Sequence, residues 1–136
     1  MLRTPLAALA ATAVAFGAAA APAVAAKKPT AKQARLITQA VRTASDNLNP
    51  RWYDVDRIKV SSLSPSWAVA WQTATKQGEG EFQPAYFILV QPTGITPRWT
   101  VVSLGTALVG CGIAPDSVLK DLTGDACPPG EGIKGS

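Results

Sequence analysis

Two periods of hydrophobic and polar residues run along the chain, and they predict one helix followed by several strands. After Thr30, apolar residues recur every three or four positions, which is the spacing of one helix face. They are Leu36, Ile37, Ala40, Val41, Ala44 and Leu48. Thr30 and Gln33 have the spacing of an N-terminal capping box, and Pro50 marks the end of the helix.

The other side of this helix is basic, a pattern that also occurs in helices bound to membrane surfaces. Its apolar face has no aromatic residue. The strands that follow also need a cover for one face. These features favour a helix that packs on a sheet.

Four runs after the helix have the composition of β-strands. They cover residues 56–62, 67–73, 85–90 and 99–104, and the connections between them are short. Short connections favour an antiparallel meander, in which consecutive strands are neighbours.

Centring each hairpin on its turn assigns the strand residues to two sheet faces. The face expected under the helix collects Ile58, Val60, Trp67, Val69, Trp71, Phe87, Leu89, Trp99 and Val101. The second face collects Arg57, Lys59, Ala68, Ala70, Tyr86, Ile88, Val90, Val102 and Leu104. A one-residue error in the register of a strand would exchange its faces. The second face is too apolar to be fully hydrated, so we expect the C-terminal segment to cover part of it.

The N-terminal segment, residues 1–26, has the form of a secretory signal peptide. Arg3 supplies the positive start, residues 6–21 are an uncharged alanine-rich run, and Ala23 and Ala25 form an A-x-A cleavage site. The run is too weakly apolar for a confident spanning helix. We therefore expect a secreted or extracytoplasmic protein with no stable membrane span after cleavage.

Export makes a disulfide between Cys111 and Cys127 the expected state of the only two cysteines. Pro115 suits the first position of a short helix, whose apolar stripe is Val118, Leu119 and Leu122. The predicted fold class is α+β: an N-terminal amphipathic helix packed on a four-stranded antiparallel meander, with a short C-terminal helix held by the disulfide. Residues 27–127 form a single globular domain, and the Gly/Pro-rich residues 128–136 are a disordered tail.

The composition excludes several classes of function. The 136-residue chain has no histidine, which removes serine and cysteine nucleophiles activated by histidine and also His-ligated zinc. Two cysteines cannot make a four-cysteine metal site. The net charge is only +4, and the basic residues are scattered, so nucleic acid is not an expected partner.

Four carboxylates are expected at one end of the meander. Asp54 and Asp56 start the first strand, and Glu79 and Glu81 lie in the loop between the second and third strands. Such oxygen ligands could hold calcium, although the spacing is not that of an EF-hand. Paired carboxylates also serve glycoside hydrolysis. A carboxylate-dependent hydrolase or lyase is therefore the enzymatic alternative, against the simpler interpretation of solvated loop charges.

Four tryptophans are dense for this length, and aromatic side chains most often fill cores. Trp67, Trp71 and Trp99 are therefore expected in the core. Trp52 and Tyr53 precede the first strand and are the candidate ligand contacts.

The last third of the chain resembles the ending of small secreted bacterial proteins of uncharacterised function. The matching pattern is Trp99-Thr-Val-Val-Ser-Leu-Gly105-Thr106, then Cys111, Pro115, Val118, Asp121-Leu122 and Cys127. This resemblance implies export and a disulfide but no activity. The order of helix and sheet also resembles the cystatin-like and NTF2-like group of curled-sheet folds. Cystatins carry a Q-x-V-x-G hairpin, and the nearest segment here, residues 91–94, lacks the valine and the spacing.

These observations together predict a small, exported, non-enzymatic domain without a cofactor. Its expected partner is a protein or a cell-envelope component. A cystatin-like protease inhibitor is the remaining alternative.

Overall fold

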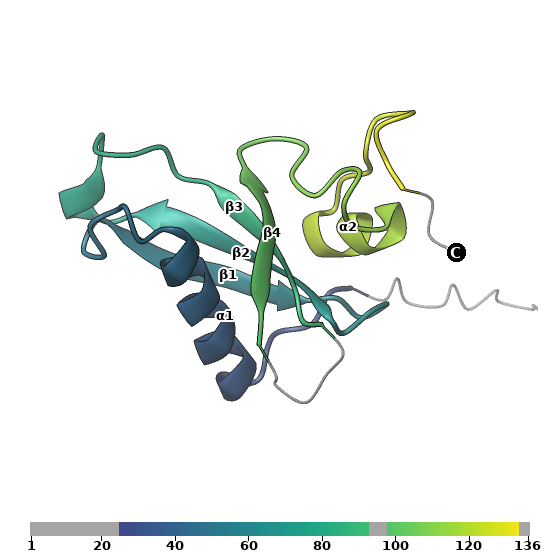
Figure 1. Ribbon diagram of the computed structural model, residues 1–136, viewed down its shortest axis with the longest axis horizontal. Helices are drawn as coiled ribbons and strands as arrows, with labels where there is room; N and C mark the ends of the chain where they lie inside the picture. Colours follow the sequence, from purple (N-terminus) through teal and green to yellow (C-terminus); the bar gives the residue numbers. More distant parts are fainter. Residues whose placement is uncertain (1–24, 93–97, 134–136) are drawn as a thin grey trace, which may run out of the picture.

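The computed structural model describes residues 25–92 and 98–133, and it has the predicted α+β architecture (Figure 1). The elements are α1 (Ala31–Ala44), β1 (Tyr53–Val60), β2 (Trp67–Ala74), the 3-10 turn η1 (Lys76–Gly78), β3 (Tyr86–Val90), β4 (Thr100–Gly105) and α2 (Asp116–Thr123). All strand pairs are antiparallel, and the order in the sheet is β1-β2-β3-β4. The meander is thus confirmed. Of the predicted leader, only Ala25 and Ala26 lie within the described residues.

The start of α1 follows from its capping box. The backbone N–H of Gln33 donates to Thr30 Oγ1 over 3.2 Å, and the N–H of Thr30 donates to Gln33 Oε1 over 2.9 Å. Two of the N–H groups that a helix start leaves unpaired thereby gain partners. The helix ends at Ala44, earlier than the apolar pattern suggested, because Ser45 turns out of the helix. Ser45 Oγ then accepts a buried hydrogen bond from Gln72 Nε2 of β2 over 3.1 Å.

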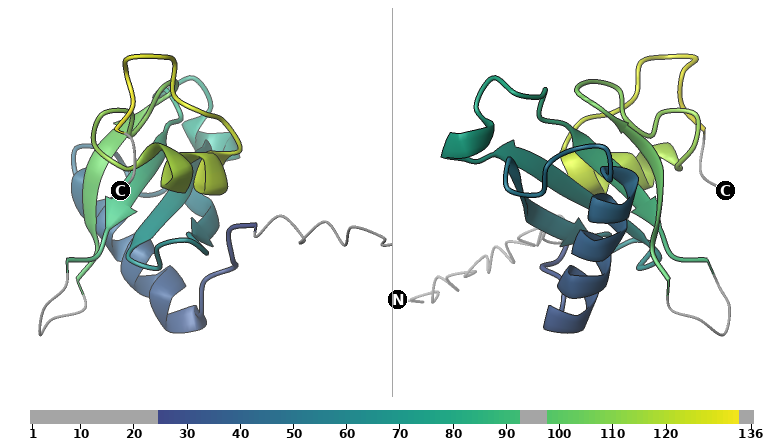
Figure 2. Two further views of the ribbon diagram at one scale, coloured as in Figure 1. Left: turned by 90° about the vertical axis from the view of Figure 1, so that its right-hand side faces the viewer. Right: turned by 60° about the vertical axis from the view of Figure 1, so that its left-hand side comes forward.

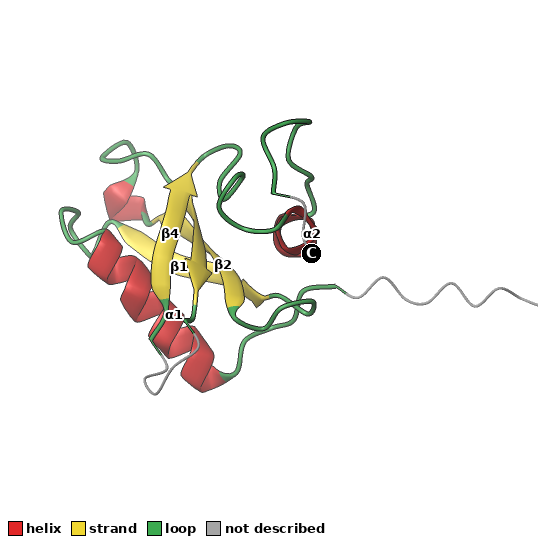
Figure 3. Cartoon of the chain, turned by 45° about the vertical axis from the view of Figure 1, so that its right-hand side comes forward, coloured by secondary structure: helices red, strands yellow, loops and turns green. Residues whose placement is uncertain are grey.

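The two helices cover opposite faces of the sheet, as Figure 3 shows. Ile37 and Val41 of α1 are buried against one face, in a core made by Val60, Ala68, Ala70, Ala85, Phe87, Leu89 and Trp99. The α2 stripe of Val118, Leu119 and Leu122 packs on the other face with Val69, Ile88, Val109 and Ala114. The C-terminal segment therefore covers the second face, as expected.

The faces of β2 are the reverse of those expected. Ala68 and Ala70 are buried under α1, whereas Trp67 and Val69 pack toward α2 and Trp71 lies opposite Tyr86 on that same side. Val60 pairs with Ala68, one residue away from the pairing that a turn-centred hairpin would have. Alanine at these two positions lets α1 approach the centre of the sheet closely, and the tryptophan of this core, Trp99, lies just before β4.

Leu104 also departs from its expected face, and part of the predicted tail is described. Leu104 pairs with Phe87, so it lies on the α1 side of the sheet, where it is 56% exposed. Residues 128–133 of the predicted tail are among the described residues, and the N–H of Asp116 donates to the Ile133 carbonyl over 2.9 Å. Residues 134–136 lie outside the described part of the chain.

The close approach of α2 to the sheet depends on one glycine. Gly110 has φ of +85°, and a Cβ built there would lie 2.7 Å from Leu119 Cδ2 and 3.0 Å from Ile88 Cγ1. Any larger residue at this position would push the α2 core apart and would also adopt a backbone conformation that favours glycine.

We expect Ala70→Leu to lower the free energy of unfolding by about 1–3 kcal/mol, because three additional carbons would be forced between β2 and α1. The measurement is urea unfolding followed by circular dichroism. Ala31→Leu, at an exposed position of α1, is the matched control and should change stability by less than about 0.5 kcal/mol. Equal effects of the two substitutions would contradict the assigned face of Ala70.

Candidate functional site

A hydrogen-bond cluster fastens α2 to the β1–β2 turn. The Asp121 carboxylate accepts from Ser61 Oγ and from the Ser62 N–H, both over 2.8 Å. It also accepts from Ser62 Oγ over 3.1 Å. Ser61 is buried, and its hydroxyl oxygen accepts the N–H of Ser64 over 3.1 Å, so the same cluster shapes the turn. Hydrogen bonds to a carboxylate are stronger than those between neutral groups. The cluster therefore sets the position of α2 over the second face.

The predicted disulfide is present and holds the other side of the same segment. Cys111 and Cys127 are bonded with their Cα atoms 5.8 Å apart, and the bond joins residues 16 positions apart in the sequence, on either side of α2. Both cysteines pack against the α2 core. With the Asp121 cluster, the disulfide gives α2 two separate attachments to the rest of the fold.

Between this segment and the sheet lies a hollow of about 480 Å³. Its lining comes from Trp71 and Tyr86 on the sheet, from the loop of Thr106, Ala107, Leu108, Val109 and Cys111, and from Leu119, Thr123, Asp125, Ala126 and Cys127. Most of these side chains are apolar, and the polar ones are few. We call this region the aromatic hollow.

The floor of the aromatic hollow is a pair of aromatic rings. Trp71 and Tyr86 are directly opposite on β2 and β3, with ring centroids 4.7 Å apart and an angle of 34° between the ring planes. The Tyr86 hydroxyl oxygen accepts the Val109 N–H over 3.4 Å, which ties the ring to the loop above it. These contacts hold both rings in place before any ligand arrives, and such order lowers the entropic cost of binding.

A cation borders the aromatic floor on the β1 side. The Arg57 guanidinium carbon lies 4.8 Å from the centre of the Trp71 ring, within the range of a cation–π contact. Arg57 also forms an exposed ion pair with Asp56 over 3.5 Å, and Asp56 accepts from Thr73 Oγ1 over 2.8 Å. Arg57, Trp71 and Tyr86 thus form a continuous row across β1, β2 and β3.

Backbone strain gathers at the same place. Among the described residues, the non-glycine positions with positive φ are Arg57, at 47°, and Leu108, at 54°. Arg57 lies in a β-bulge where the register of β1 shifts between Asp56 and Lys59. Leu108 lines the hollow and is 53% exposed. Such conformations cost about 1–3 kcal/mol each and are concentrated at ligand sites and switches. The strain therefore supports a binding role for this region.

The candidate contact residues Trp52 and Tyr53 lie elsewhere, beside α1 and η1. Tyr53 is only 2% exposed and packs edge-on against Phe82, with the Arg42 guanidinium 5.5 Å from its ring centre. Trp52 is half-buried, and its carbonyl accepts the Thr75 N–H over 2.8 Å. The Tyr53 ring is thus part of the interior, and neither residue lines the aromatic hollow.

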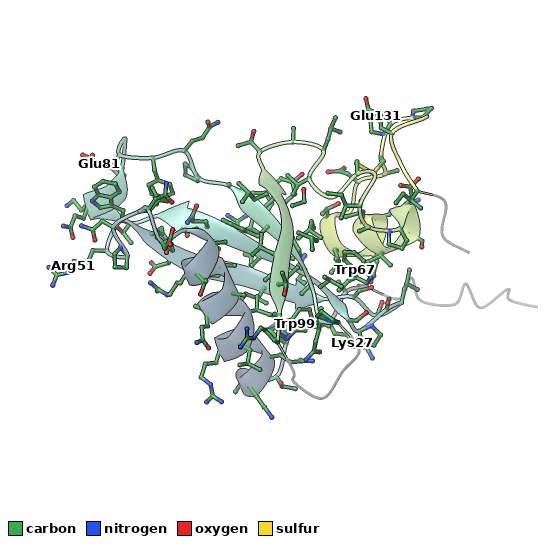
Figure 4. The ribbon with its side chains drawn as sticks, in the orientation of Figure 1. Lys27, Arg51, Trp67, Glu81, Trp99 and Glu131 are labelled. Atoms are coloured by element: carbon green, nitrogen blue, oxygen red, sulfur yellow. A yellow bond between two sulfur atoms is a disulfide. The ribbon has the colours of Figure 1, made fainter. Side chains whose placement is uncertain are left out.

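The four candidate carboxylates are not gathered into one site. Within residues 25–92 and 98–133, no group of three or more His, Cys, Asp or Glu side chains is arranged to hold a metal ion. The Asp56 carboxylate forms an ion pair with Arg57 and accepts a hydrogen bond from Thr73 Oγ1. In Figure 4, Glu81 and Arg51 lie at the same end of the molecule.

Comparison of the chain with protein-family models, with curated proteins and with solved structures found no match. None of the helices in the described part of the chain has the length and apolar character needed to cross a membrane. The function has to be inferred from the residues of this chain alone.

The turn-centred register places Tyr86 and Arg57 on the second face but puts Trp71 on the opposite one. Because the two faces of β2 are exchanged in the structure, these three residues are neighbours. The positive φ of Leu108 carries no signal in the sequence, because leucine does not favour that conformation. The alternation of large and small residues in β2 is the one pattern that could have located the aromatic floor.

We expect Asp121→Ala to lower the free energy of unfolding by about 1–3 kcal/mol, because the buried Ser61 hydroxyl would lose its acceptor. Thermal unfolding of the oxidised protein measures the effect. Asp125→Ala, an exposed carboxylate just beyond α2, is the control and should leave the melting temperature nearly unchanged. A similar loss in both variants would mean that only general charge, and not the Asp121 cluster, stabilises α2.

Replacing both Cys111 and Cys127 by Ser should cost about 3 kcal/mol, the value that chain entropy gives for a loop of this size. Urea unfolding of the double variant should coincide with that of the reduced wild-type protein.

Reduction should also raise the intact mass of the wild-type protein by about 2 Da, the signature of one disulfide. An unchanged mass would show that the purified protein is already reduced.

Proposed function

We propose that this protein is an exported, non-enzymatic binding domain, and that the aromatic hollow receives an apolar group of a protein or cell-envelope partner. The observation that carries the proposal is the coincidence of a preformed hollow with an aromatic floor and two strained residues, Arg57 and Leu108, at its border.

The chemistry of the aromatic hollow supports an apolar anchor with a polar surround. Binding hot spots commonly pair a buried apolar group with a well-packed pocket, surrounded by polar contacts that exclude water. Here the floor and walls are aromatic and aliphatic, while Thr106, Thr123 and Asp125 lie among the lining residues. Arg57 adds a cation beside the floor, which suits a partner with an acceptor or an anionic group next to its apolar anchor.

Export is part of this proposal and rests on two features. The leader-like residues 1–26 precede the domain. A disulfide closes the C-terminal segment, and such bonds persist mainly in oxidising compartments. A partner in the medium or on the cell envelope would then meet the aromatic hollow directly.

No specific observation favours the two alternatives. A carboxylate-dependent hydrolase needs two carboxylates facing one substrate, and Asp56 is engaged with its own neighbours. The segment compared with the cystatin hairpin, residues 91–94, lies partly outside the described residues.

The test is capture from the organism's own culture medium and envelope fraction by immobilised, oxidised protein with mild crosslinking. Leu108→Asp should reduce recovery of the specific partner about tenfold or more, as expected when a central apolar anchor is lost. Aspartate tolerates positive φ better than leucine does, so this variant should fold at least as well as the wild type.

Leu63→Asp is the matched control, because Leu63 is 55% exposed but lies in the β1–β2 turn, away from the aromatic hollow. It should capture the partner as the wild type does. Equal capture by wild type and both variants would reject the aromatic hollow as the binding site. A catalytic turnover that persists in clean recombinant protein would reject the non-enzymatic part of the proposal.

A further inference from the structure

A second surface, on the opposite side of the sheet, is independent of the aromatic hollow. A groove of about 800 Å³ runs between α1 and the first half of β4. Its lining is Leu36, Gln39, Ala40, Thr43 and Ala44 from the helix, and Arg98, Trp99, Thr100 and Val101 from the strand. We call it the α1–β4 groove. Figure 2 shows that β4 lies at the margin of the sheet, with α1 beside it.

The outer edge of β4 has no strand partner within the described residues. The order of the sheet ends at β4, and the isolated bridges outside the sheet join Lys27 to Val60 and Pro115 to Ile133. The backbone N–H and C=O groups on this edge can therefore pair with an added strand.

The pairing of β3 with its two neighbours determines which backbone groups of β4 face outward. The backbone N–H of Gln72 donates to the Ala85 carbonyl over 2.8 Å, and the backbone N–H of Gln91 donates to the Ser66 carbonyl over 2.7 Å. The odd-numbered residues of β3 therefore form their backbone hydrogen bonds with β2. The even-numbered Tyr86 and Ile88 then bond to β4, opposite Gly105 and Ser103. In an antiparallel pair these bonded positions alternate with positions that point away. The N–H of Leu104, which lies between them, therefore points to the free edge.

The two edges of the sheet are protected very differently. β1 carries Asp54, Asp56, Arg57 and Lys59, has a bulge, and is partly paired by Lys27, whose N–H donates to the Val60 carbonyl over 2.8 Å. Charges, bulges and covering segments are the usual means by which proteins block strand addition. β4 (Thr100–Gly105) also has a register shift, between Ser103 and Val101, but it contains no charged residue, has no covering segment among the described residues and exposes Leu104. Only the β4 edge is thus open to a partner strand.

The charge around the α1–β4 groove is of one sign. The first half of helix α1 carries Lys32 and Arg35, the helix has no acidic residue, and Arg98 lines the groove just before β4, whereas Arg42 contacts Tyr53 of β1. The first carboxylate after the helix is Asp46, beyond its end. Two copies joined by their β4 strands would bring these like charges together. A segment with acidic residues would instead complement them.

A buried donor adds a second indication. Trp99 is 4% exposed, and its indole Nε1 has no hydrogen-bond partner among the described residues. Buried polar groups are almost always paired in native structures. Trp99 lines the α1–β4 groove, so an occupant there could supply the missing acceptor with a small movement of the ring.

We propose that the free edge of β4 binds an extended, acidic segment of another protein, which adds to the sheet as a further strand and places its side chains in the α1–β4 groove. Main-chain hydrogen bonds to β4 supply the affinity, and the groove and its cations supply the selectivity.

The probe is a synthetic peptide of alternating valine and threonine with glutamate at both ends. Binding to the oxidised protein should slow exchange of the Leu104 amide about tenfold or more, as expected for a newly formed hydrogen bond. It should also shift the indole N–H resonance of Trp99, assigned with Trp99→Phe. A lysine-ended peptide should bind severalfold more weakly. A glutamate-ended peptide with N-methylated amides on its pairing edge should not protect Leu104.

Two variants separate backbone pairing from side-chain contact. Leu104→Ala and Leu104→Pro both remove the exposed leucine, but only Leu104→Pro removes the outward N–H, a change that edge strands tolerate. The alanine variant should retain most of the peptide affinity, and the proline variant should lose it. If Leu104→Pro does not fold, the N-methylated peptide tests the same hydrogen bond from the other side.

Three results would overturn the proposal. One is the absence of binding by the glutamate-ended peptide at millimolar concentration. Another is loss of the backbone-pairing effect: Leu104→Ala and Leu104→Pro bind the glutamate-ended peptide equally, or the wild type binds the N-methylated peptide as well as the unmodified one. The third is Leu104 protection that rises with protein concentration without peptide, which would assign the edge to a second copy of this chain.

Discussion

The structure depends on one strand that serves two cores with side chains of unequal size. On β2, Ala68 and Ala70 face α1, while Trp67, Val69 and Trp71 face the α2 side. The small side chains of Ala68 and Ala70 let α1 pack directly against the centre of the sheet. This distribution brings α1 close to one face and makes the other face bulky and aromatic. The aromatic hollow, with Trp71 and Tyr86 as its floor, is a direct consequence.

Features decided by nearby residues could be predicted from the sequence. The capping box of Thr30 and Gln33, the stripe of Val118, Leu119 and Leu122, and the antiparallel meander all follow from spacing and short connections. The disulfide followed from the count of cysteines and the leader-like start of the chain. Each of these inferences uses contacts between residues close in the chain, or a constraint that leaves a single choice.

Features that depend on residues distant in the sequence could not be predicted. The β1–β2 turn is shaped by Asp121, 60 residues away from Ser61 in the sequence, and β1 contains a bulge at Arg57. A turn-centred register allows for neither, so it exchanged the faces of β2 and separated Trp71 from Tyr86. The same limitation applies to Trp52 and Tyr53. Trp52 lies just before β1 and Tyr53 is its first residue, but α1, η1 and Phe82 surround them from other parts of the chain.

The unequal edges of the sheet also limit how this protein can assemble. A protein with two open edges can add copies of itself without end and form fibres. Here Lys27 and the charged, bulged β1 close one edge, so the sheet can grow at β4 only. A copy of this protein that joins the edge of another sheet through β4 therefore presents only its closed β1 edge, so strand addition stops at that copy. The molecule can end a growing sheet but cannot continue one.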